Sequence, residues 1–147
     1  LCDMKKIQSK KKANPTLMRV VIHGIDHARV ACKVASKISG QIELWSANGA
    51  AGFIGPAWFQ EIINLVRLEF PQVKIDGVLD CGTPSGYALA ALRQGITHIF
   101  ISSRYLSSVK LKQIAQKHGA VVETHRPVLL DLGLTNNPEE SLWKKYG

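Results

Sequence analysis

Short hydrophobic segments alternate with amphipathic stretches along this chain, and this alternation limits its possible folds more than any other feature. The five hydrophobic segments lie at residues 17–22, 42–45, 75–79, 97–101 and 120–123. They have the length and the β-branched content of strands, and residues 17–22 are apolar almost throughout, as in a strand buried on both faces. Strands that alternate with helices form parallel sheets with right-handed crossover connections.

The stretches between these segments have the apolar spacing and the end signals of helices. Between residues 56 and 70 apolar side chains recur at helical spacing, Pro56 is a favoured first helical residue, and Pro71 ends the stretch. Three further helices are expected around residues 31–38, 84–94 and 107–118.

The predicted fold is a three-layer α/β sandwich with an open, mainly parallel sheet of about five strands, Rossmann-like and doubly wound. The 147 residues are too few for a closed barrel of eight such units, which takes about 250 residues. A half barrel that dimerises is the alternative.

Residues 16–147 are expected to form a single domain with a C-terminal extension from about residue 127. In this extension residues 128–134 form an edge strand or a loop, and Trp143 is expected to anchor a short helix to the body or to a second subunit.

The charge of the chain is concentrated at its N-terminus. The net charge of the chain is +8. Residues 1–14 contain five lysines and one aspartate, so they carry a net charge of +4, half of the total. Residues 1–15 are therefore expected to form a basic, flexible arm, and the body is only mildly basic. Nucleic acid is not the expected partner, because the body lacks aromatic residues interleaved with basic ones.

Cysteine usage and hydropathy indicate a cytoplasmic protein with no membrane association. Cys2, Cys32 and Cys81 are the three cysteines, and no two of them form a CxxC pair, which suits a reducing compartment. No apolar run reaches the ~18 residues that a membrane-spanning helix needs.

The functional site is expected at the carboxyl ends of the predicted strands. In parallel sheets the loops at this edge lead into helix N-termini, where ligands bind. These loops, at residues 23–27, 46–55, 80–86, 102–105 and 124–127, are rich in glycine, histidine and arginine. The loops at the opposite edge are short.

The loop before residue 56 contains the sequence Gly-Ala-Ala-Gly-Phe-Ile-Gly, from Gly49 to Gly55. It resembles the glycine-rich turn of the extended short-chain dehydrogenases. The resemblance implies NAD(P) as cofactor, with its pyrophosphate against Gly49, Gly52 and Gly55 and an acidic residue on the ribose, here Asp80.

This sequence also departs from that family's pattern. A complete strand–helix unit precedes the motif, and Tyr105 and Lys110 are separated by four residues rather than the three of the family's Tyr-x-x-x-Lys. A turn that needs positive φ angles explains the three glycines equally well.

The loop from Asp80 to Gly86 also ends a strand and enters a helix. Its glycines and the capping residue Thr83 would form a nest for a phosphate or carboxylate, although a helix cap alone also explains Thr83. The loop lacks the Lys-Ser/Thr ending of a P-loop, so nucleotide hydrolysis is not expected.

Two arginines at the same edge, Arg104 and Arg126, would make the cleft electropositive. The candidate ligand-binding residues are Asn48, Gly49, Gly52, Gly55, Asp80, Gly82, Thr83, Ser85, Arg104 and Arg126.

Catalytic and metal-binding candidates are fewer. Cys81 near a helix N-terminus is a candidate nucleophile, with Asp80 and His23 as further catalytic candidates, but Cys81 also fits a small buried residue. His23, His27 and His125 are candidate metal ligands at the same edge, although the first two share a face only if residues 23–27 are helical.

These features predict a small protein that binds an anionic small molecule, phosphorylated, nucleotide-like or carboxylated, at the carboxyl edge of its sheet. They assign no reaction and leave open whether the protein is an enzyme. The alternative is a non-catalytic interaction or regulatory module that forms homodimers through its exposed sheet edges.

Overall fold

The computed structural model describes residues 17–82, 85–102 and 109–147, and every structural statement below concerns these residues. The expected N-terminal arm at residues 1–15, together with Thr83 and Arg104, lies outside them.

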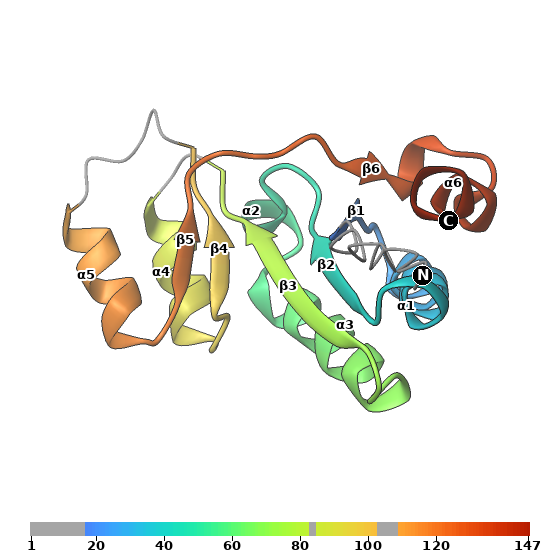
Figure 1. The fold of residues 1–147 in the computed structure, drawn as a ribbon. Helices are drawn as coiled ribbons and strands as arrows, with labels where there is room; N and C mark the ends of the chain where they lie inside the picture. Colours follow the sequence, from blue (N-terminus) through green and yellow to red (C-terminus); the bar gives the residue numbers. More distant parts are fainter. Residues whose placement is uncertain (1–16, 83–84, 103–108) are drawn as a thin grey trace, which may run out of the picture.

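Six strands form one open sheet in which every neighbouring pair is parallel, in the order β5-β4-β3-β2-β1-β6. The strands are β1 (Met18–Val21), β2 (Gln41–Trp45), β3 (Lys74–Asp80), β4 (His98–Phe100), β5 (Val121–Glu123) and β6 (Leu130–Asp131). The helices are α1 (Ile25–Ile38), α2 (Ala50–Phe53), α3 (Pro56–Glu69), α4 (Ser85–Arg93), α5 (Val109–Lys117) and α6 (Pro138–Tyr146), with a 3-10 turn η2 (Leu132–Leu134). The predicted α/β fold, an open parallel sheet flanked by helices, is confirmed, with a sixth strand at the edge beyond β1 (Figure 1).

The connections from β1 to β5 all step in the same direction across the sheet. Right-handed crossovers that step one way place their helices on one face. The main hydrophobic cluster accordingly joins alternate strand residues to side chains from all six helices. On the opposite face Val21, Trp45, Val78 and Phe100 form a smaller cluster, against which Leu129 of the β5–β6 connection packs. The two faces of the sheet therefore differ in what covers them.

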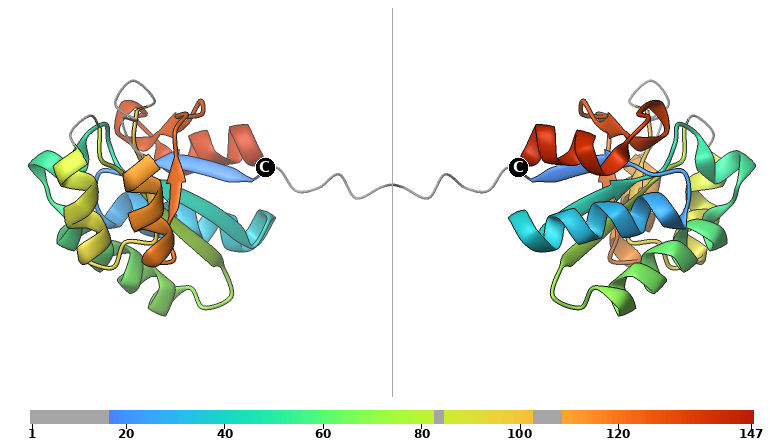
Figure 2. Two further views of the ribbon diagram at one scale, coloured as in Figure 1. Left: turned by 90° about the vertical axis from the view of Figure 1, so that its left-hand side faces the viewer. Right: turned by 90° about the vertical axis from the view of Figure 1, so that its right-hand side faces the viewer.

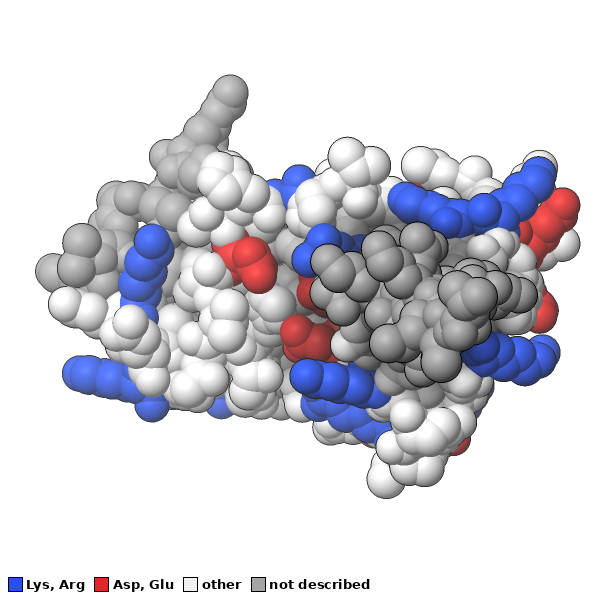
Figure 3. Space-filling view, viewed as in Figure 1, with Lys and Arg blue, Asp and Glu red and all other residues white. Residues whose placement is uncertain are grey.

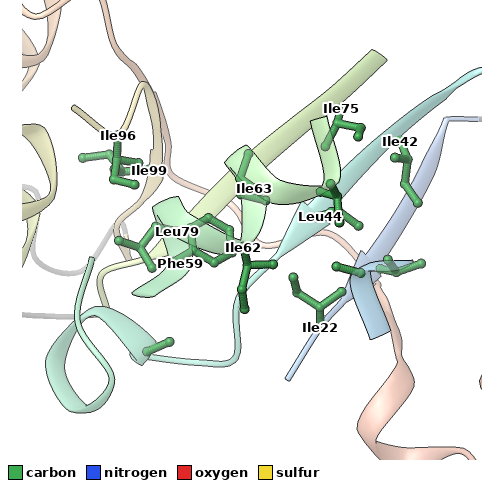
Figure 4. Close-up of a cluster of buried hydrophobic side chains, with 14 of the residues drawn as sticks. Ile22, Ile42, Leu44, Phe59, Ile62, Ile63, Ile75, Leu79, Ile96 and Ile99 are labelled. Carbon is green, nitrogen blue, oxygen red and sulfur yellow. The ribbon is translucent and has the colours of Figure 1, made fainter. Parts of the chain in front are cut away.

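Helix α3 provides the centre of the main cluster. Its buried residues follow the spacing that the sequence predicts, and Figure 4 shows Phe59, Ile62 and Ile63 against side chains of β2 and β3. Gly77 of β3 lies under this helix, where a Cβ atom would come within 2.6 Å of Ile63 Cγ1. A side chain at position 77 would therefore force the Ile63 side chain, or the helix that carries it, to shift.

The C-terminal extension covers the β1 edge of the sheet. β6 pairs with the last two residues of β1, and α6 packs next to α1, as the side views in Figure 2 show. β6 does not extend to Arg19 of β1. There the Tyr146 hydroxyl accepts a hydrogen bond from Arg19 N (3.2 Å) and donates one to Arg19 O (3.1 Å). Leu142 is fully buried, whereas Trp143 is 38% exposed. The residues that anchor α6 to the body are thus Leu142 and Tyr146 rather than Trp143.

Within the described ranges, none of the helices has both the length and the apolar character needed to cross a membrane.

Substitution of Gly77 by alanine is expected to destabilise the fold by about 1–3 kcal/mol, because the added methyl group overpacks the contact with Ile63. Urea unfolding of the purified protein measures this change. Gly86→Ala is the matched control, since a Cβ at this α4 position meets nothing within 4 Å and alanine is the better helix former. Equal stability of the Gly77→Ala variant and the wild type would contradict the packing described here.

Candidate functional site

Asp80, the last residue of β3, joins the loops at the carboxyl edge of the sheet. Its side chain is almost completely buried, and its Oδ1 accepts hydrogen bonds from Gly49 N (3.0 Å) and Gly82 N (2.8 Å). Its own backbone N–H donates to Ser46 Oγ at 2.8 Å. The loops after β2 and β3 are therefore both bound to one carboxylate.

Arg126 brings a third loop to the same carboxylate. Its Nη1 lies 2.5 Å from Asp80 Oδ2, and its Nη2 donates to Ser46 O at 3.1 Å. The guanidinium carbon also lies 5.3 Å from the centre of the Trp45 ring, a distance at which a cation is attracted to an aromatic face. We call the group of Ser46, Gly49, Asp80, Gly82 and Arg126 the Asp80 junction.

The structure brings Gly49, Asp80, Gly82 and Arg126 together, as the sequence predicts, but around a group of the protein itself. The backbone amides of Gly49 and Gly82 donate to Asp80, and Arg126 pairs with the same carboxylate. Asp80 thus occupies the position expected for a ligand anion. These donors compensate the buried charge, which is costly when left unpaired.

The remaining residues of the glycine-rich loop have structural roles. Gly49 and Gly55 adopt positive φ angles of 64° and 99°, as in the turn explanation of the motif. Gly52 lies within α2, and a Cβ there would come within 2.8 Å of the Tyr87 ring. Asn48 is exposed. The short helix α2 (Ala50–Phe53) lies within this loop, so the glycine-rich segment is not a simple turn between a strand and a long helix.

Two of the predicted ligand-binding residues, Thr83 and Arg104, lie outside the described residues. Ser85 is the first residue of α4, and its side chain also lies outside them.

Cys81 lacks the environment of a reactive thiolate. Its side chain is 1% exposed, and burial, together with the charge of Asp80, raises the pKa of the thiol to about 12. A thiol with this pKa is protonated at neutral pH and is a poor nucleophile.

His23 follows β1 and is held by the carboxylate of Asp131, the last residue of the adjacent strand β6. Its Nε2 lies 2.7 Å from Asp131 Oδ1, which also accepts a hydrogen bond from Gly133 N at 2.8 Å. The backbone N–H of His23 donates a hydrogen bond to His27 Nδ1 at 3.1 Å. The lone pair of this nitrogen is therefore not free to bind a metal ion. Burial, followed by the charge of His23, lowers the pKa of His27.

The described part of the chain contains no group of three or more His, Cys, Asp or Glu side chains placed to hold a metal ion. Of the three predicted ligands, His23 and His27 stack edge to face with ring centres 5.8 Å apart, whereas His125 lines a different part of the edge.

The structure also shows a set of charged side chains that the sequence analysis did not single out. Each of the strands β1 to β5 contributes a titratable residue to a band across the face opposite the main helices. This band, which we call the polar band, consists of Arg19, Glu43, Asp76, His98 and Glu123, and β3 also carries Lys74 and Asp80 on the same face. The strand register places Glu43 of β2 between Arg19 of β1 and Asp76 of β3. Figure 3 looks onto this face, and acidic side chains lie near its middle.

Most of the polar band is paired across strands. Arg19 Nε lies 3.4 Å from Glu43 Oε1, which also accepts a 2.6 Å hydrogen bond from the indole N–H of Trp45. His98 Nδ1 lies 2.6 Å from Asp76 Oδ2, and its Nε2 lies 3.0 Å from Glu123 Oε1. An imidazole between two carboxylates is held best when both of its nitrogens are protonated. His98 therefore ties three strands together.

A cavity of about 130 Å³ opens next to the polar band, at the carboxyl ends of β2 and β5. Its lining residues come from three strands and from the β5–β6 connection and include both signs of charge: Arg19, Glu43, Trp45, Glu123, His125 and Pro127. The signal in the sequence that points to this cavity is the charged residue within each of the hydrophobic strands β1, β2 and β5.

No protein-family model matches this chain, and no curated protein matches it in sequence.

Replacement of Arg126 by methionine is expected to destabilise the fold by about 3–5 kcal/mol, because Asp80 then remains buried without its counter-charge. The Asp80→Asn, Arg126→Met double variant should recover part of this loss. Urea unfolding measures both, and Glu140→Gln, which removes a solvent-exposed ion pair with Lys144, is the control and should change stability by no more than about 0.5 kcal/mol. Strictly additive effects at positions 80 and 126 would show that the pair is not coupled.

The stability of the protein is expected to depend on the protonation of His98. Burial lowers the pKa of His98, but the hydrogen bonds and charges of Asp76 and Glu123 outweigh it, so the pKa is raised above 6.5. Because the folded pKa lies above the unfolded one, this contribution is complete below pH 6.5 and is lost as the pH rises through the folded pKa.

Urea unfolding of the wild type and of His98→Gln between about pH 5.5 and about pH 9 tests this dependence. The difference in unfolding free energy between the two proteins should shrink as the pH rises over this range. Parallel curves would show that His98 does not titrate differently in the folded and unfolded states.

Proposed function

We propose that this protein binds a small molecule bearing both a carboxylate and an amino group, at the carboxyl edge of its sheet. The observation that carries the proposal is the cavity of about 130 Å³ beside the polar band, whose lining contains Arg19 and His125 as well as Glu43 and Glu123. The proposal concerns binding and includes no reaction.

Arg19 is the residue best placed to bind the carboxylate. Its side chain is 43% exposed, and its buried Nε lies 3.4 Å from Glu43 Oε1 without forming a hydrogen bond. A carboxylate accepts two parallel hydrogen bonds from a guanidinium group, so a carboxylate ligand would pair with the solvent-exposed part of the Arg19 guanidinium. His125, exposed at the rim of the cavity, adds a second donor.

The acidic lining narrows the class of ligand. Glu43 and Glu123 face the same cavity as Arg19, so a ligand with two or more negative charges meets Coulomb repulsion there. Glu123 uses Oε1 for His98, and its side chain is 43% exposed, which leaves it accessible to a donor. An amino group near Glu123 and a carboxylate near Arg19 would satisfy both sides of the cavity.

The size and stiffness of the cavity also support a small ligand. Its volume of about 130 Å³ is smaller than the roughly 300–1,000 Å³ of pockets for drug-sized ligands, which suits a carboxylate on a short carbon chain and not a whole nucleotide. The wall is fixed, because Trp45 donates to Glu43 and lies beneath the guanidinium of Arg126. A wall whose side chains are already held loses little entropy on binding.

This proposal does not include a nucleotide cofactor at the glycine-rich loop. The Gly49 and Gly82 amides, which the sequence analysis assigns to an anion, donate to Asp80.

A thermal-shift titration with small α-amino acids tests the proposal. Amino acids with short side chains are expected to raise the melting temperature in a saturable manner, with a stabilisation of about 2.7 kcal/mol at roughly 100 times the dissociation constant. The corresponding carboxylic acids without an amino group, and the amines without a carboxylate, should give smaller shifts at equal concentration.

Variants at the two ends of the cavity locate the binding. Arg19→Gln and Glu123→Gln should each weaken the binding of the amino acid by about 10-fold or more. Lys33→Gln, at an exposed position of α1 that faces α6, should leave the affinity unchanged. If no amino acid shifts the melting temperature, or if Arg19→Gln and Lys33→Gln behave alike, the protein does not bind such a ligand in this cavity.

A further inference from the structure

The two edges of the sheet differ in how they are covered. At the β1 edge, β6 and the Tyr146 hydroxyl take up backbone groups of β1. At the other edge, β5 pairs only with β4 among the described strands. Proteins protect such an edge with lysine, proline or a covering segment, but β5 consists of Val121, Val122 and Glu123.

The backbone of Val122 points away from the sheet. Val121 N donates to Thr97 O, and Glu123 O accepts from Ile101 N, so the backbones of these two residues face β4. Because successive residues of a strand direct their backbone groups to opposite sides, the N–H and C=O of Val122 face outward. No described residue pairs with them, so they can pair with one more strand.

A groove runs beside this open edge. Its volume is about 260 Å³, and it is lined by Lys112, Ala115 and Gln116 of α5 and by Ala120 and Val122 at β5. Its lining combines three apolar side chains with the amide of Gln116 and the cation of Lys112. On the opposite face Val121 is 55% exposed. An added strand would therefore place one side chain in the groove and the next one beside Val121.

The described side chains next to the groove are basic. Lys112 and Lys117 are exposed on α5, and Glu123, the acidic residue of β5, is paired with His98. A second copy of the chain that paired through β5 would bring two such basic regions together, which Coulomb repulsion opposes. An acidic partner meets complementary charge instead.

From the open backbone of β5, the groove and this charge we infer that β5 accepts an extended acidic peptide as an additional strand. Main-chain hydrogen bonds to Val122 provide the pairing, an apolar side chain of the peptide enters the groove, and acidic side chains lie near Lys112. This mode of recognition adds a strand to a free sheet edge. It uses a surface distinct from the cavity at Arg19.

Fluorescence anisotropy with a labelled peptide of alternating glutamate and valine, added to the 147-residue chain, tests this inference. The peptide should bind in a saturable and salt-dependent manner, and the peptide with lysine in place of glutamate should not. Lys112→Glu is expected to weaken binding by about fivefold or more, and Lys144→Glu on α6 is the control that should leave binding unchanged.

Pairing with the strand edge is tested separately from charge. A glutamate–valine peptide with N-methyl groups on alternate residues keeps its charge but loses its pairing donors, and it should not bind. The amide of Val122 should exchange more slowly with solvent when the unmethylated peptide is bound, while that of Val121 should not change. Equal binding of the methylated peptide, full competition by a single-stranded oligonucleotide of the same charge, or absence of binding would each overturn the inference.

Discussion

A buried carboxylate at the end of a central strand holds the carboxyl edge of this molecule together. Asp80 accepts hydrogen bonds from the amides of Gly49 and Gly82 and pairs with Arg126. An ionised carboxylate away from water is unfavourable by several kcal/mol unless such donors surround it. Because these donors belong to three different loops, the position of each loop depends on Asp80. The placement of Arg126 over Trp45, and with it one wall of the proposed binding cavity, depends on the same carboxylate.

The direction in which the chain crosses the sheet explains why polar groups gather on one face. The connections from β1 to β5 step one way, and the side chains of the helices pack against one set of alternate strand residues. The other set is free to include titratable residues. These charges are compatible with folding because they meet opposite charges across strands, Arg19 with Glu43, and His98 with Asp76 and Glu123.

The sequence was sufficient for the alternation of strands and helices, because hydrophobic periodicity and Gly or Pro at the ends of elements are local signals. It also identified the region around Asp80, since strand ends in parallel sheets meet at one edge. It did not reveal that Asp80 itself accepts the hydrogen bonds of Gly49 and Gly82, because that contact joins residues 31 positions apart. The polar band was missed for a related reason: an isolated Arg19 or Glu43 in an apolar segment reads as part of a strand buried on both faces.

The course of the chain after β5 accounts for both surfaces to which we assign binding. After Glu123 the chain does not form another crossover helix. It runs from the β5 edge to the opposite edge of the sheet and forms β6 beside β1 (Figure 1). On the way, His125 and Pro127 close one side of the cavity at Arg19. Because β6 forms at the β1 edge, the outer side of β5 pairs with no strand in the described part of the chain. A single change in chain direction therefore encloses a small polar cavity and leaves a basic strand edge open.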